Sequence, residues 1–138
     1  MSDVVLAPAE WSDQVARTLE RATGLNSAYT VAELEQEVRA GATKLMAVVE
    51  RRGADPVLLG YVCLWLEPQG QGLEMVLQAG AALTEEKAAL DKAMPAIERV
   101  ARDMGAGSIR VHVAHTARRR LMERQGFREA ERVLRKGV

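Results

Sequence analysis

The chain has 138 residues, the length of one ordinary domain, and its 48% hydrophobic and 28% charged residues are typical of a globular protein and exclude a disordered or fibrous one. Its 19 basic and 19 acidic residues cancel, so no net charge draws it to nucleic acid or to a membrane. No apolar stretch reaches the roughly 18 residues of a membrane span. The N-terminus also lacks the basic start and apolar run of a secretory signal, so we expect a protein that is not secreted and is cytoplasmic or part of a particle assembled inside a cell.

The charge is unevenly distributed along the chain. Residues 118–138 contain eight basic and three acidic residues, so this end carries +5 and the remainder carries −5. Such asymmetry predicts a contact with an acidic partner, which includes another copy of the same chain. A solvated helix face followed by an exposed strand is the simpler interpretation of the same residues.

The first elements are a strand and two helices. The β-branched run "VVLAPA" predicts a strand over residues 4–9. In residues 10–24, apolar side chains recur at the spacing of one helix face, and Gly24 is expected just beyond the helix end. Thr30 followed by Glu33 forms a capping box, which predicts the start of a short second helix.

Three strands then follow with short turns between them. Residues 44–51, 56–68 and 73–83 are apolar runs separated by "RGAD" and "QGQG", which predicts an antiparallel meander. The middle run is apolar on both faces, as expected for a central strand covered by helices on both sides. Cys63 lies in this run, has no partner for an internal disulfide and no metal-ligand companions, and is expected to be a small core residue.

The last third of the chain predicts helix, strand, helix and strand. An apolar stripe runs through the helix expected over residues 84–105, where Pro95 should cause a kink or open a second helix. "SIRVHV" predicts a strand, "TARRRLMERQG" a helix ending at Gly126, and residues 127–136 a final alternating strand. The complete order is β-α-α-β-β-β-α-β-α-β, an α/β (α+β) chain with a mixed, mostly antiparallel sheet flanked by helices.

This order and the closing segment resemble the GNAT superfamily, the Gcn5-related N-acetyltransferases. The segment "VHVAHTARRRLMERQGF" is similar to the family's closing pattern V-x-x-x-N-x-x-A-x-x-L-Y-E-K-x-G-F, and "LLGYV" is similar to its usual third-strand run. The pattern is matched at Leu121, Glu123, Arg124, Gly126 and Phe127. The resemblance covers nearly the whole chain and implies a single GNAT-like domain over residues 1–138.

The resemblance also implies where acetyl-CoA would bind. The family's cofactor motif, Q/R-x-x-G-x-G/A, opens the helix after the third meander strand, and its backbone N–H groups and helix dipole bind the pyrophosphate. Here the basic or amide position is Glu85 and the two glycine positions are Ala88 and Leu90, so charge and side-chain bulk both oppose the anion. The backbone of Leu77, Gln78 and Ala79 would hold the pantetheine arm.

The catalytic positions of the family are altered as well. The tyrosine that protonates the leaving thiolate falls on Met122, which has no proton to give, and the asparagine position falls on His115. His115 has the chemistry of an acid or base near neutral pH, although a lone histidine at such a junction more often hydrogen-bonds the turn. Glu74 is the candidate general base, with Glu67 second, and Gly80 is expected to mark a bulge that opens the sheet.

Three functions remain open from the sequence. The first is a GNAT-fold protein that has lost acetyl-CoA catalysis and is a structural or binding component, because "VAHTARRRLM" is similar to degenerate acetyltransferase-like virion proteins of short-tailed bacteriophages. The second is an active acetyl-CoA-dependent N-acetyltransferase with an altered cofactor loop, and the third is an antitoxin-like or regulatory partner domain. The first predicts other protein subunits as partners, with no membrane, no nucleic acid, no cofactor and no metal.

Overall fold

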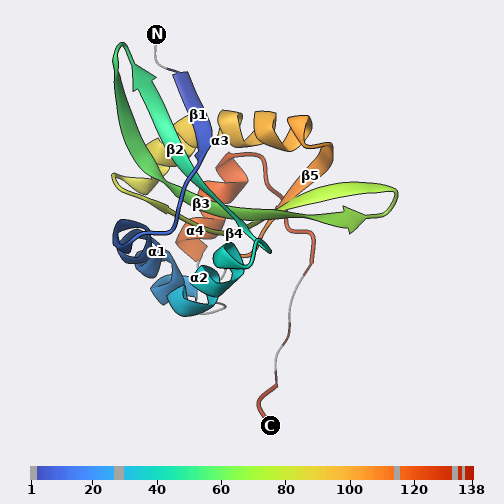
Figure 1. Ribbon diagram of the computed structural model, residues 1–138. Helices are drawn as coiled ribbons and strands as arrows, with labels where there is room; N and C mark the ends of the chain where they lie inside the picture. The colour runs from blue at the N-terminus through green and yellow to red at the C-terminus, as the bar shows by residue number, and fades with distance from the viewer. Residues whose placement is uncertain (1–2, 27–29, 114–115, 132–133, 135) are drawn as a thin grey trace.

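The computed structural model describes residues 3–26, 30–113, 116–131, 134 and 136–138. Within them, a five-stranded sheet in the order β1-β2-β3-β4-β5 separates two groups of helices (Figure 1). The elements in chain order are β1 (Asp3–Pro8), α1 (Asp13–Asn26), α2 (Val31–Arg39), β2 (Lys44–Arg52), β3 (Asp55–Gln69), β4 (Gly72–Ala82), α3 (Glu86–Asp103), β5 (Ala106–Val111) and α4 (Thr116–Arg124).

The sheet is antiparallel from β1 to β4, and β5 is parallel to β4. The meander is therefore confirmed, and the mixed sheet follows from the crossover through α3. On the β3–β4 ladder, Cys63 pairs with Ala79 and Leu64 pairs with Leu77, which leaves Gln78 as an extra residue. The bulge thus lies at Gln78, and the prediction of a bulge at Gly80 is wrong because Gly80 pairs regularly with Val62.

Each face of the sheet has its own core. On one face, Leu64, Met75 and Leu77 pack with Met94 and Ile97 of α3. On the other face, α1 and α2 supply Val15, Leu19 and Leu34, which pack with strand residues that include Tyr61 and Cys63. The central strand is buried from both sides, which explains its continuous apolar sequence.

The short second helix begins as the capping box predicts. The Thr30 hydroxyl accepts a hydrogen bond of 3.1 Å from the backbone N–H of Glu33, which satisfies one of the free donors of the first turn. Beyond the helix end, Gly41 has φ +79°, the left-handed conformation expected there. Across the described residues, no helix combines the length and the apolar character that a membrane crossing requires.

The predicted end at Gly24 is wrong, and one of the two alternatives given for Pro95 is excluded. The first helix continues through Gly24 to Asn26, so that glycine does not terminate it. Residues 86–103 form one helix, so Pro95 does not open a second one. Pro95 lies on the exposed side of α3, where the carbonyl that lost its partner can be hydrated.

The closing helix ends as predicted, but the expected last strand is absent from the described residues. Gly126 has φ +94°, and the N–H of Phe127 donates to the carbonyl of Met122 at 3.2 Å, which fixes the turn after α4. Phe127 then packs against the core under α3. Residues 127–131, 134 and 136–138 have no strand structure, and in Figure 1 the chain after α4 leads away from the sheet.

Candidate functional site

A hollow opens where β4 and β5 part. The two strands pair from Leu73 with Ala106 as far as Leu77 with Val111, where β5 ends. β4 continues to Ala82, and residues 78–82 line the hollow beyond the last pair. The space therefore results from strand register and strand length, two features of the backbone.

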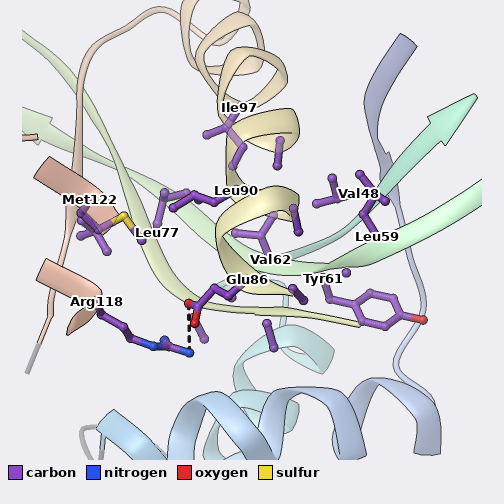
Figure 2. Close-up of a pocket in the computed structure, with 18 of the residues that line it drawn as sticks. Val48, Leu59, Tyr61, Val62, Leu77, Glu86, Leu90, Ile97, Arg118 and Met122 are labelled. Atoms are coloured by element: carbon purple, nitrogen blue, oxygen red, sulfur yellow. Dashed lines mark ion pairs between the residues drawn. The ribbon is translucent and has the colours of Figure 1, made fainter. Parts of the chain in front are cut away.

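The hollow lies between the sheet, α3 and α4 and is largely apolar (Figure 2). Its cavity volume is about 120 Å³, which is smaller than the roughly 300–1,000 Å³ of most small-molecule sites. Aliphatic side chains from β2, β3, β4, α3 and β5 form the walls, among them Val48, Leu59, Leu77, Leu90 and Ile97. Met122 of α4 adds a thioether at one side.

Small residues bring the backbone close to this space. A Cβ atom on Gly60 would lie 2.3 Å from the carbonyl oxygen of Ala81, so β3 and β4 meet here more closely than any side chain allows. Ala79, Gly80 and Ala81 on β4 and Ala89 on α3 also line the hollow. This composition leaves room beside the sheet that larger side chains would fill.

An ion pair spans one end of the hollow. Glu86, the first residue of α3, accepts from Arg118 on the first turn of α4, with 3.2 Å between Nη2 and Oε1 (Figure 2). The Arg118 side chain is 19% exposed and that of Glu86 39% exposed, so the pair is partly shielded from water. The anion that Arg118 holds is thus a carboxylate of the chain itself.

The start of α3 differs from an anion-binding helix start. Glu85 occupies the N-cap position, but its side chain makes no capping hydrogen bond, and it is exposed. The first-turn N–H groups keep their partial positive charge, and the carboxylates of Glu85 and Glu86 lie beside it. These two negative charges favour the helix and oppose an anionic ligand.

The structure brings four of the six predicted cofactor-binding residues to the hollow. Leu77, Gln78, Ala79 and Leu90 line it, whereas Glu85 and Ala88 are exposed and do not. Leu90 packs against the core as well, so its side chain is part of the wall. Whether these residues bind a cofactor stays a prediction.

The side chain of Gln78 is engaged on the α2 side of the sheet. Its amide nitrogen donates to Glu37 at 2.5 Å, and its amide oxygen accepts from the hydroxyl of Thr43 at 2.8 Å. Gln78 is 6% exposed and Thr43 is 3% exposed, so this network is buried and satisfied. The bulge therefore ties β4 to α2 next to the point where the sheet opens.

The candidate bases Glu74 and Glu67 lie away from the hollow as cross-strand neighbours on β4 and β3, and both contact Arg110 of β5. The guanidinium contacts Glu67 at 2.7 Å and Glu74 at 3.2 Å. Glu74 also accepts from the hydroxyl of Ser108 at 2.7 Å. A hydrogen bond from the indole of Trp65 and the charge of Arg110 hold the pKa of Glu67 below its usual value.

These contacts give both carboxylates structural partners. Glu74 accepts one bond on each carboxylate oxygen, from Arg110 and from Ser108, and thereby joins β4 to β5. The other catalytic candidate, His115, lies outside the described residues. Met122 lines the hollow where the resemblance places a tyrosine, and it has no proton to donate.

The described residues contain no group of three or more His, Cys, Asp or Glu side chains placed to hold a metal ion. Cys63 is fully buried, and burial, with the nearby Glu37 charge, raises the pKa of its thiol to about 12. Since the thiolate is the reactive form, Cys63 is an inert core residue.

Solved structures of acetyltransferases share this fold over nearly the whole chain. A probable acetyltransferase matches with a TM-score of 0.70 at 16% identity, covering 98% of this chain and 95% of its own. YycN of Bacillus subtilis, a putative acetyltransferase, matches with 0.69 at 19%, covering 98% of each chain. The aminoglycoside N-acetyltransferase AAC(6')-Iy, solved in complex with CoA, matches with 0.63 at 12%, covering 100% of this chain and 95% of its own.

These likenesses show the fold. The chain has the GNAT acetyltransferase fold, which confirms the α/β class and the mostly antiparallel sheet predicted from the element order. No protein-family model matches the sequence, and neither does any curated protein.

Sequence reasoning missed the residue that completes the site. The solvated helix face expected from the charges of residues 118–138 includes Arg118, but the structure leaves Arg119 and Arg120 exposed and Arg118 only partly exposed. Arg119 pairs with Glu123 one turn away, as a surface cation does. A signal was present, since Arg118 falls in the first turn of α4, where a cation opposes the helix dipole and needs a compensating anion.

Proposed function

We propose that this GNAT-fold chain does not carry out acetyl-CoA catalysis and is a binding or structural component. The observation that carries the proposal is the Glu86–Arg118 ion pair at the start of α3, where enzymes of the resembled superfamily bind the pyrophosphate. In this chain an internal carboxylate takes the cation, and Glu85 adds a second negative charge next to it.

The repulsion between Glu86 and a bound pyrophosphate can be estimated from Coulomb's law. Two like charges 4 Å apart repel by about 1 kcal/mol in bulk water and about 4 kcal/mol near a protein surface. A pyrophosphate at the start of α3 would meet Glu86 at this range, and it would also have to compete for Arg118. The repulsion from Glu86 and the cost of separating Glu86 from Arg118 together exceed the favourable energy of about 0.3–1 kcal/mol that a helix dipole gives an anion at an exposed terminus.

The chemistry of the remaining candidates supports the same proposal. Glu74 is bonded to Arg110 and Ser108, and Met122 lines the hollow without a transferable proton. A Glu74 carboxylate engaged with β5 and a thioether at the tyrosine position both support a chain that does not transfer an acyl group to an amine.

The setting that we propose is the virion of a short-tailed bacteriophage, with other protein subunits as partners. Support comes from the likeness of residues 113–122 to virion proteins of that kind, and from the separation of charge between the basic end and the acidic remainder. Such a charge pattern suits contacts between subunits.

Calorimetric titration with acetyl-CoA tests the loss of cofactor binding. We expect no heat of binding up to about 1 mM cofactor, a limit that corresponds to about −4 kcal/mol. An active acetyltransferase of the same fold, titrated in the same buffer, is the positive control. Binding in the micromolar range, with transfer of the acetyl group to an amine, would overturn the proposal in favour of the enzyme.

Mass spectrometry of purified particles tests the setting. The chain should co-purify with capsid, portal or tail proteins in a constant ratio to them. Its presence in the infected-cell lysate together with its absence from purified particles would rule out the virion role.

A further inference from the structure

We propose that the hollow beneath the Glu86–Arg118 ion pair binds an uncharged, apolar small molecule. The inference rests on the proposed function, because it assumes that acetyl-CoA does not fill this space. It goes beyond that function by giving the site a ligand class defined by its charge.

The walls determine the polarity of the ligand. Leu59, Val62, Leu77 and Ile97 present aliphatic carbon to the space, and Ala89 and Ala93 leave room between them. The side-chain amide of Gln78 is directed to Glu37 and is occupied there. An apolar ligand would replace water along these walls, which is the main source of affinity in sites of this kind.

The charges determine the net charge of the ligand. Among the described residues that line the hollow, the charged or titratable side chains are Glu86, Arg118, His112 and Tyr61. The Glu86–Arg118 pair is neutral as a unit, and the Tyr61 hydroxyl donates to Gln14 at 3.3 Å. An anionic ligand would have to displace Glu86 from Arg118, and a cationic one would have to displace Arg118 from Glu86.

Two dyes that share the same anilinonaphthalene framework and differ in charge distinguish a neutral ligand from an anionic one. N-phenyl-1-naphthylamine is neutral, and its 8-sulfonate, 1-anilinonaphthalene-8-sulfonate, carries one negative charge. Both become fluorescent in apolar surroundings, so titration gives comparable dissociation constants. The neutral dye should bind the native chain in a saturable manner, at least about tenfold more tightly than the sulfonate, because the sulfonate meets Glu86.

Variants place the binding in the hollow. Ala89→Leu adds bulk to the wall on α3 and should weaken the neutral dye at least about tenfold, by steric exclusion. Ala32→Leu makes the same change at an exposed position of α2 outside the hollow and should leave the dissociation constant within about twofold. Ala82→Leu on β4 is a second filling variant, and circular dichroism establishes that each variant is folded.

Glu86→Gln tests the charge argument separately. It frees Arg118 while keeping the side-chain volume, so the sulfonate should gain at least about tenfold in affinity relative to the neutral dye. An unchanged preference would overturn the assignment of ligand charge to this pair.

The remaining outcomes also decide the matter. No saturable binding of the neutral dye, or binding that both filling variants leave unchanged, overturns the proposal. If both filling variants fail to fold, methyl NMR shifts of Leu77 and Ile97 in the native chain on addition of the neutral dye replace them, and unshifted methyls overturn it. If the chain binds neither acetyl-CoA nor the neutral dye, the proposed function stands and this inference is overturned. If the chain binds acetyl-CoA, the proposed function is overturned regardless of the result with the dyes.

Discussion

Replacing Glu86 by glutamine should strengthen the binding of an anion at the start of α3. The change removes one negative charge beside the helix terminus and releases the Arg118 guanidinium, now bonded to it at 3.2 Å. The N–H groups of the first turn have no capping side chain, so they remain available to an anion. The perturbation therefore acts on charge alone, with the hollow and the helix left in place.

The magnitude follows from the exposure of the pair. Like charges at 4 Å cost about 1–4 kcal/mol between the limits of water and a protein surface. Glu86 is 39% exposed and Arg118 is 19% exposed, which places the pair between these limits. We take about 2 kcal/mol, which is roughly 30-fold in the affinity for acetyl-CoA. The lost ion pair should cost the fold no more than about 1 kcal/mol.

Calorimetry with acetyl-CoA on Glu86→Gln and Glu85→Gln is the assay. Glu85 is adjacent, equally charged and exposed, with no hydrogen bond from its side chain to the helix start, so it is the matched control. We expect Glu85→Gln to improve affinity by less than about fivefold, because a solvated charge is screened. Equal effects of the two variants, or none from either, would refute the assignment of the obstacle to Glu86.

Three further predictions concern the scaffold that positions the site. Thr30→Ala should lower the free energy of unfolding by about 1 kcal/mol in urea, because it removes the cap of α2, while Thr30→Ser should retain most of it; equal losses from both variants would contradict the capping argument. Gly60→Ala should cost about 1–3 kcal/mol, since its Cβ would lie 2.3 Å from a carbonyl oxygen of β4, and the matched Gly80→Ala, whose nearest atom is 3.7 Å away, should cost less than half as much. Burial raises the pKa of Cys63 from 9.0 to about 12, so between these values the unfolded chain releases a proton that the folded chain keeps, and stability falls as pH rises. The native chain should therefore lose about 1.6 kcal/mol more than Cys63→Ala between pH 9 and pH 10.5, and parallel pH profiles of the two proteins would contradict the buried-thiol interpretation.

Local signals in the sequence account for most of the fold. The Thr30 capping box, the Gly-containing turns of the meander and the Gly126–Phe127 ending each depend on a few neighbouring residues, and the structure has all of them. The final strand predicted over residues 127–136 had no such local signal. Alternation of apolar and polar residues shows that a segment can form a strand, but not that it pairs with the edge of a sheet. The bulge was likewise misplaced at Gly80, since a bulge at Gln78 is stabilised by Glu37, 41 residues away.

The candidate site was predictable only in part, for a geometric reason. Counting along the resemblance located the start of α3 and its two glutamates, but a helix turns by about 100° per residue. Whether Glu85 or Glu86 faces the hollow therefore depends on one residue in the helix start, and the structure selects Glu86. Arg118 lies 32 positions further along the chain, and no local pattern joins it to Glu86.

The hollow and the ion pair have separate causes, and this separation decides what the variants can show. The hollow exists because β4 continues beyond the end of β5 and because small residues lie along both walls. A substitution at Glu86 changes neither feature. The ion pair depends on two side chains at one end of that space. Filling variants therefore change whether any ligand enters, whereas Glu86→Gln changes which charge a ligand can carry. If Glu86→Gln admitted acetyl-CoA without catalysis, the proposed loss of catalysis would also involve the acid and base positions, where Glu74 is bonded to Arg110 and Met122 has no proton to give.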